Sequence, residues 1–367
     1  MAPREETLTP AEVTALRARF LRGFPAISLA IFLSAVDQTI TATALPAIAA
    51  DLGALERVAW IVVAYLVAAT CAAPVFGQLG DVFGRRKLLF VGLGLFAAGA
   101  IGCALAPDLS VLIGARIERG TGGGALYTLG QALIGEAVPP RERGRFQAYI
   151  ASTFAAASAF GPVAGGFITQ WFGWRAVFWA LLPLGVLCVA LSGRLMRVAP
   201  ARREHRLHFD WAGLGLFVVM IAAALVALDR FRRMDIASLP WAALLVLVAI
   251  LAGWLLGRAE RAARDPLLPL GMFRDATIWR SLTLSAAVAG GIVGTIAFLP
   301  IYLQAVRGLG PGEAGLLLVP LSIAAAVGAI FAGRMVARTG LGMVWPGVGL
   351  GVSALVMAAI ALSLGAL

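Results

Sequence analysis

Long apolar runs recur along almost the whole chain, and they limit its possible folds more than any other feature. Hydrophobic residues make up 60% of the 367 residues, and charged residues only 13%, about half of the ~25% found in a soluble domain. So few charges cannot cover the surface of a soluble globule of this length. Runs of about 20 apolar residues are what a helix needs to cross a bilayer. The sequence therefore predicts an all-α, polytopic membrane protein.

Polar breaks divide this apolar sequence into about eleven predicted helices. They are expected at residues 24–48, 58–80, 88–106, 109–132, 146–169, 175–196, 211–229, 239–257, 281–304, 313–333 and 342–365. The predicted domains are a cytoplasmic tail (1–23), a six-helix bundle (24–197), a cytoplasmic loop (198–210), two linker helices (211–258), a second loop (259–280) and three helices of a second bundle (281–367). The tail is not read as a cleavable signal peptide, because the first apolar run is too long for one.

The positive charges indicate an orientation in the membrane. Basic residues cluster between the apolar runs, and most of them fall on one side when the chain is threaded back and forth from a cytoplasmic N-terminus. This is the positive-inside pattern of a bacterial inner-membrane protein. The loop with Arg230, Arg232 and Arg233 departs from it. The net charge of +11 is thus explained by topology, and we expect no nucleic-acid partner.

An internal repeat links the two ends of the chain. The segment GQLGDVFG (77–84) follows the second predicted helix, and the similar GRMVARTG (333–340) follows the tenth. Duplicated halves of this kind are typical of secondary transporters. Because the first bundle has six predicted helices and the second only three, we expect the second bundle to be incomplete, with its last three helices missing.

Five motifs in order resemble the major facilitator superfamily. They are AVDQTITATALPAIAADL (35–52), GQLGDVFGRRK (77–87), RIERGTGGGA (116–125), GPVAGG (161–166) and FLPIYLQAVRGLGPGEAGLLLVP (298–320). With the two linker helices, they are similar to its drug:proton antiporters of fourteen helices. The resemblance implies the major facilitator fold and an antiporter of the multidrug efflux type, associated with antibiotic resistance.

The loop motif is predicted to be a cytoplasmic latch. Its residues are Gly77, Asp81, Gly84, Arg85 and Arg86. Glycines permit a tight helix end, and the acid and the arginines can form charge-assisted bonds. The resemblance implies that this loop joins the two bundles in one state of the transport cycle. The alternative is a simple positive-inside anchor.

Asp37 and Arg116 are predicted to pair within the membrane. Each is placed roughly 20 Å from the cytoplasmic face, at about 1.5 Å per helical residue. An isolated charge at such a depth is costly and normally has a partner or lines a watery cavity. The resemblance implies a role in proton coupling. A static ion pair is the alternative.

Glu118 and Arg119 depart from the family pattern, in which the position of Arg119 is usually glutamine. At about 100° per residue, Arg119 falls on the side of Arg116 and Glu118 falls nearly opposite. Glu118 is a candidate second proton site, an attraction for cationic substrates, a partner for a basic group on a neighbouring helix, or only a local compensation for Arg119. The glycines after it, including Gly120 and Gly124, predict close helix packing.

The fifth predicted helix carries Gly161, Pro162, Gly165 and Gly166, which resemble the antiporter motif. Proline interrupts the helical hydrogen bonds, and the glycines supply a kink or a packing groove. The resemblance implies exchange and not uptake. A generic proline kink is the alternative.

Three polar side chains are candidates for a substrate cavity, namely Tyr65, Tyr302 and Gln304. No nucleophile–base set, metal-ligand cluster or phosphate-binding loop is present in the sequence, so we expect no enzyme, no metal and no cofactor, and the proton gradient as energy source. The partners expected are the lipid bilayer, protons and a small hydrophobic or cationic substrate.

The sequence leaves three functions open. The first is proton-coupled export of lipophilic, drug- or antibiotic-like molecules across the cytoplasmic membrane. The second is export of one endogenous metabolite. The third is a truncated membrane protein without transport activity.

Overall fold

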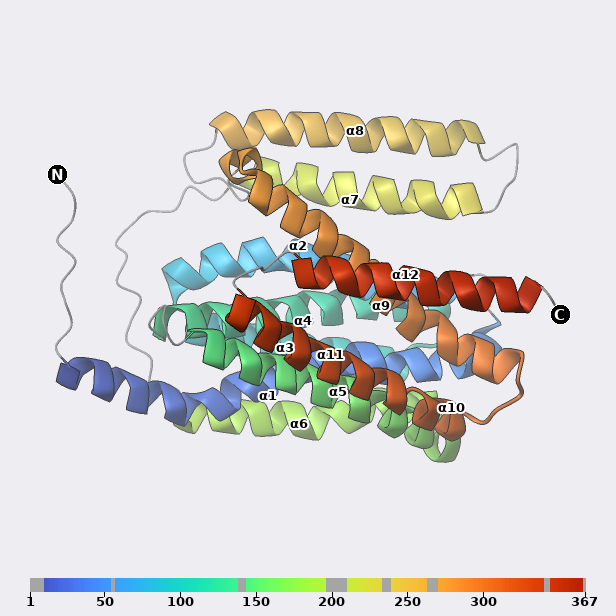
Figure 1. Ribbon diagram of the computed structural model, residues 1–367, viewed down its shortest axis with the longest axis horizontal. Coiled ribbons are helices and arrows are strands. Elements are labelled where there is room, and N and C mark those ends of the chain that lie inside the picture. Colours follow the sequence, from blue (N-terminus) through green and yellow to red (C-terminus); the bar gives the residue numbers. More distant parts are fainter. Residues whose placement is uncertain are drawn as a thin grey trace.

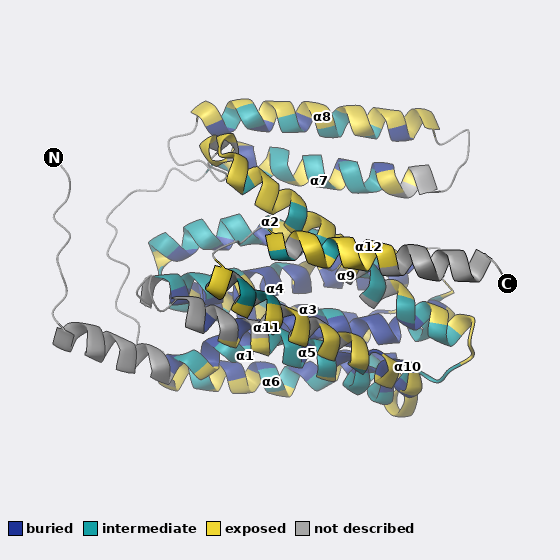
Figure 2. Ribbon diagram, viewed as in Figure 1, coloured by how far each residue is buried: buried dark blue, intermediate teal, exposed yellow. Residues whose placement is uncertain are grey.

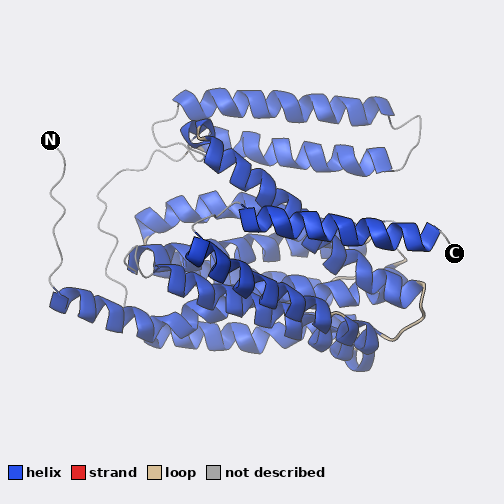
Figure 3. Ribbon diagram, viewed as in Figure 1, coloured by secondary structure: helices blue, strands red, loops and turns tan. Residues whose placement is uncertain are grey.

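The computed structural model is built from long helices. It describes residues 10–53, 57–137, 143–195, 210–232, 239–262, 270–339 and 344–365. In these ranges every regular element is a helix (Figure 3). The predicted all-α fold class is therefore confirmed.

Six helices form the first bundle. Their bounds are α1 (Pro10–Leu52), α2 (Ala59–Phe83), α3 (Arg85–Leu105), α4 (Leu109–Ala137), α5 (Arg143–Phe172) and α6 (Trp174–Leu195). The remaining elements are α7 (Trp211–Arg232), α8 (Leu239–Ala262), a short 3-10 helix (Leu270–Arg274), α9 (Ala276–Ala305), α10 (Pro311–Leu317), α11 (Val319–Thr339) and α12 (Val344–Gly365).

Two of the predicted elements differ from the observed ones. The first helix begins at Pro10, so part of the segment expected to be a tail is helical. The single helix predicted over 313–333 is divided into α10 and α11 at Leu318. The division has a local cause, because Pro320 has no N–H to donate to the Leu316 carbonyl oxygen. The backbone N–H of Leu318 donates to the Gly315 carbonyl oxygen over 3.2 Å, which ends α10.

The central helix of the first bundle is α1, which packs against α4, α5, α6 and α9. Helix α4 packs between α2 and α3. The buried residues concentrate in this bundle, whereas α8, α9, α11 and α12 are largely exposed where they are described (Figure 2). Helices α7 and α8 lie side by side at one edge of the molecule (Figure 1), and α7 packs against α2.

Several described helices suit a bilayer. Six of them are long and apolar enough to cross a membrane by length and composition, namely α1 from Gly23 onwards, α2, α3, α6, α7 and α8. Helix α4 is not in this set, and it carries the charged residues of the site described below. The chain is a multi-pass membrane protein.

Glycines bring the backbone of α4 into direct contact with its neighbours. A Cβ atom added at Gly120 would collide with the Tyr65 carbonyl oxygen of α2, and one at Gly124 would collide with that of Ala69. On the other side of α4, a Cβ atom added at Gly122 would collide with the backbone of α3. The close helix packing predicted from these glycines is confirmed.

We therefore expect Gly120→Ala to destabilise the protein by about 1–3 kcal/mol, the usual cost of overpacking. Gly114→Ala is the matched control on the same helix, because a Cβ atom there has open space around it. Alanine at position 114 should leave stability unchanged or raise it by up to about 1 kcal/mol. Thermal unfolding of the two variants in detergent tests this difference. Equal melting temperatures would contradict the packing described for α4.

Candidate functional site

Asp37 lies near the middle of α1 and is completely buried. Two arginines of α4 donate to its carboxylate. Arg116 Nη1 donates to Oδ2, and Arg119 Nε donates to Oδ1, each over 2.6 Å. Both arginines are at most 1% exposed. One acid and two cations thus share a site that is closed to solvent.

Arg116 is held at more than one point. Besides its bond to Asp37, its Nε donates to the carbonyl oxygen of Ile61 over 3.1 Å. Its guanidinium lies over the ring of Tyr65, with Cζ 4.5 Å from the ring centroid. A cation over an aromatic face is attracted by the ring's quadrupole. Helix α2 therefore fixes this arginine by both backbone and side chain.

Arg119 has fewer polar contacts. Its Nη1 and Nη2 are buried and have no hydrogen-bond partner in the described part of the chain. Its guanidinium lies 4.2 Å from the ring centroid of Phe96 and 5.6 Å from that of Phe178. Two aromatic rings, one from α3 and one from α6, therefore take the place of water around this charge.

The sequence predicted half of this arrangement. The expected pair of Asp37 and Arg116 is present, but Arg119 was not expected to join it. The signal for Arg119 was its spacing, because residues three apart on a helix lie on the same face. Sequence alone does not tell which of the neighbouring helices that face meets.

Glu118 does not belong to this buried cluster. It is exposed, on a different face of α4 from the two arginines. Arg119 forms its ion pair with Asp37 of α1 and not with Glu118, and the role of Glu118 stays a prediction.

Tyr65 was predicted to line a substrate cavity, and the structure places it among the helices of its own bundle. The side chain is completely buried in the first bundle, and its hydroxyl donates to the carbonyl oxygen of Ser34 over 3.2 Å. Its ring instead supports Arg116. A tyrosine in a membrane helix can line a cavity or support a cation, and the sequence does not distinguish the two. The position of α4, which places Arg116 over the ring, distinguishes them.

The glycines of the predicted antiporter motif lie at two close contacts of α5. Gly161 and Gly165 pack against α1, where added Cβ atoms would collide with Thr39 and with the Ile40 carbonyl oxygen, respectively. Gly166 packs against α10, and its added Cβ would collide with the carbonyl oxygen of Pro311.

Further contacts join the first bundle to the later helices at the same end. The backbone N–H of Gly312 donates to Gln170 Oε1 over 3.2 Å, and a Cβ atom at Gly315 would collide with the carbonyl oxygen of Pro162. Gln304 Nε2 of α9 donates to the carbonyl oxygen of Thr43 over 3.1 Å. Gln304 is thus part of a helix contact, while Tyr302, the third residue predicted for a cavity, is half-exposed.

The residues of the predicted latch contact their own bundle. Arg85 forms an ion pair with Asp81 over 2.8 Å, and Arg86 donates to the Gly193 carbonyl oxygen at the end of α6 over 2.9 Å. Gly84 has a φ of 91°, a conformation that favours glycine at a turn. A Cβ atom added at Gly77 would lie 3.8 Å from Thr128 of α4, an ordinary contact. These contacts hold α2, α3 and α6 together at one end.

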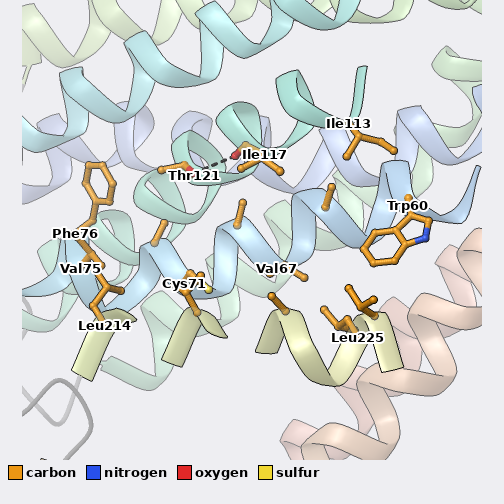
Figure 4. A pocket seen from close by; sticks show the side chains of 16 residues that line it. Trp60, Val67, Cys71, Val75, Phe76, Ile113, Ile117, Thr121, Leu214 and Leu225 are labelled. Atoms are coloured by element: carbon orange, nitrogen blue, oxygen red, sulfur yellow. Dashed lines mark hydrogen bonds between the residues drawn. The ribbon is translucent and has the colours of Figure 1, made fainter. Parts of the chain in front are cut away.

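An apolar pocket of about 450 Å³ lies between α2, α4 and α7 (Figure 4). Trp60, Val67 and Cys71 point into it from α2, facing Leu214 and Leu225 of α7. The Thr121 hydroxyl in its wall donates to the Ile117 carbonyl oxygen. The pocket presents mainly hydrocarbon to an occupant, so it has few groups that could orient a polar ligand.

No group of three or more metal-ligating side chains occurs among the residues that the structure describes. The three cysteines, Cys71, Cys103 and Cys188, are all free thiols.

Comparison with known proteins identifies the family. Residues 27–367 match the family model described as Major Facilitator Superfamily. The chain is 34% identical over 339 residues to the MFS-type efflux pump LUC4 of Fusarium sp, covering 90% of this chain and 60% of that protein. It is 31% identical to the multidrug transporter protein MdtP of Bacillus subtilis (strain 168), covering 85% of this chain and 58% of that protein.

A solved structure supports the fold. The D-xylose-proton symporter superimposes with a TM-score of 0.59 at 16% identity, over 87% of this chain and 69% of the symporter. The chain spans about 60% of the length of the curated relatives it matches. It belongs to the Major Facilitator Superfamily, a family of membrane transporters and not of enzymes.

Proposed function

We propose that this chain acts in proton-coupled export of lipophilic, drug-like small molecules, by exchange of substrate for protons. The observation that carries the proposal is the buried carboxylate of Asp37, bonded to two arginines inside a membrane bundle. Ionisable residues at such a depth are costly, and they usually mark a pathway for ions or protons. The relatives named efflux pumps and multidrug transporters support the direction of transport and the substrate class.

The bundle contacts suggest how the exchange proceeds. At one end, α5 and α10 touch through Gly166 and Gly315. At the other end lies the loop with Asp81 and Arg85. We place this loop in the cytoplasm, following the positive-inside rule, with the N-terminus on the same side of the cytoplasmic membrane. The α5–α10 contact then closes the outer end, and substrate enters from the inner end between the bundles. Proton binding at Asp37 and contacts of the Asp81 loop set which end is open.

A second candidate function is export of one endogenous metabolite. A relative from Aspergillus aculeatus, 33% identical over 331 residues, is named as the MFS-type transporter of the acurin A biosynthesis cluster. Competition between unrelated lipophilic compounds in membrane vesicles distinguishes the two. Mutual inhibition by many of them favours drug export, and inhibition by a single compound favours the metabolite.

Replacing Asp37 with asparagine should abolish efflux driven by a pH gradient, because the side chain can no longer exchange a proton. Efflux of a fluorescent lipophilic cation from vesicles with an imposed gradient provides the measurement. Asp51→Asn is the matched control on the same helix. Asp51 forms an exposed pair with Arg175, and such pairs contribute little to stability.

Two observations make the result with Asp37 decisive. Asp37→Asn should still insert in the membrane, and Asp37→Glu, which keeps the acid, should retain measurable efflux. Undiminished efflux in the asparagine variant would rule out Asp37 as the proton site.

The α5–α10 contact yields a second prediction. Gly315→Ala should open the outer end, because a Cβ atom there collides with the backbone of α5. A cysteine in place of Thr43, which is fully buried beside this contact, should then react several-fold faster with a membrane-impermeant maleimide added outside. Protein without the added cysteine corrects for the native thiols.

Gly310→Ala is the control, since its Cβ atom would lie 3.8 Å from the nearest neighbouring atom, an ordinary contact. Thr43→Cys should stay protected in that background. Equal labelling with alanine at 310 or 315 would mean that this contact does not close the outer end.

A further inference from the structure

We propose that Arg119 is a positioning residue that controls when Asp37 accepts a proton. This inference rests on the proposed function, in which Asp37 is the proton site. It adds a residue that the family resemblance does not supply, because the resemblance implies only Asp37 and Arg116.

Both carboxylate oxygens of Asp37 are already occupied by donors. Arg116 Nη1 covers Oδ2 and Arg119 Nε covers Oδ1, each at 2.6 Å. A protonated carboxyl group can still accept hydrogen bonds on its free lone pairs, but it carries no charge. Both arginines therefore favour the ionised carboxylate, and a proton must compete with the two of them.

Arg119 is held by fewer hydrogen bonds than Arg116. Arg116 also donates to the Ile61 carbonyl oxygen, whereas Nη1 and Nη2 of Arg119 have no hydrogen-bond partner among the described residues. The other contacts of the Arg119 guanidinium are with the rings of Phe96 and Phe178. Arg119 is therefore the arginine whose polar contacts are with Asp37 alone.

Among the residues that the structure describes, Asp37 is the one acid that pairs with these two arginines. The charged or titratable groups that face it are Arg116 and Arg119 from α4, the Tyr65 hydroxyl from α2 and the Cys103 thiol from α3. On the other sides, α6 contributes the ring of Phe178. The remaining neighbours supply backbone groups, such as the Ala157 carbonyl oxygen of α5, which accepts from Thr39. When Asp37 is protonated, two guanidinium groups remain with no negative charge between them.

The repulsion that results acts on helices that are in close contact. Arg119 lies against Phe96 of α3, and a Cβ atom at Gly99 of α3 would lie 2.5 Å from the Arg119 backbone nitrogen. The Arg119 side chain therefore has little space in which to move alone. Proton binding at Asp37 adds one positive charge to the site and breaks no covalent bond, and movement of α3 against α4 would relieve the repulsion.

The test is a pH titration of the Asp37 carboxyl group by infrared difference spectroscopy on the full chain in liposomes. The band lost in Asp37→Asn identifies the signal. In Arg119→Gln, protonation leaves one uncompensated cation and not two, so the titration midpoint should rise by about one to three pH units, the usual effect of one charge at this distance. Arg119→Lys keeps the charge and should titrate within about half a unit of the parent chain.

Arg175→Gln is the matched control, because it removes a cation from the exposed pair with Asp51 and should leave the midpoint unchanged. Arg119→Met replaces the glutamine variant if that variant fails to insert, with the same expected rise. An unchanged midpoint in the neutral variants, or an equal rise in Arg175→Gln, overturns the proposal for Arg119. Loss of efflux in Asp37→Asn is measured separately, so the proposed function can stand while this inference fails.

Discussion

A buried charge must have a partner, and the centre of this bundle is organised around that requirement. Asp37 is completely enclosed by α1 and its neighbours, where an unpaired carboxylate would cost several kcal/mol. Its two arginines come from a single helix, α4. Helix α4 must therefore lie close to α1 and present one chosen face to it.

The glycines of α4 make that close approach possible. Gly120 and Gly124 place its backbone directly against α2, and Gly122 places it against α3. Larger side chains would move α4 outwards, and the 2.6 Å bonds of the arginines to Asp37 would be lost with it. The ion pairs therefore depend on the helix packing. The glycines that allow close contact follow directly after the arginines in the sequence of α4, so both act at the same place.

Glycines also allow close backbone contact between the first bundle and the later helices. On α5, Gly166 faces the backbone of α10, while Gly161 and Gly165 face α1. One helix therefore contacts the centre of its own bundle and the later helices through a single glycine motif. The Asp37 site is not isolated from this contact, since Gly161 meets Thr39, two residues along α1.

The amino-acid sequence by itself determined the membrane class, the helical fold, the family and the pairing of Asp37 with Arg116. These follow from the length of the apolar runs, from the motifs, and from the high cost of an isolated charge in a bilayer, all of which are properties of local sequence. Only the tertiary structure decided that Arg119 binds the same carboxylate, that Tyr65 supports Arg116 and that Glu118 is exposed. The reason is that the face of a helix is readable from its period, whereas the neighbour that meets that face depends on how all the helices pack together.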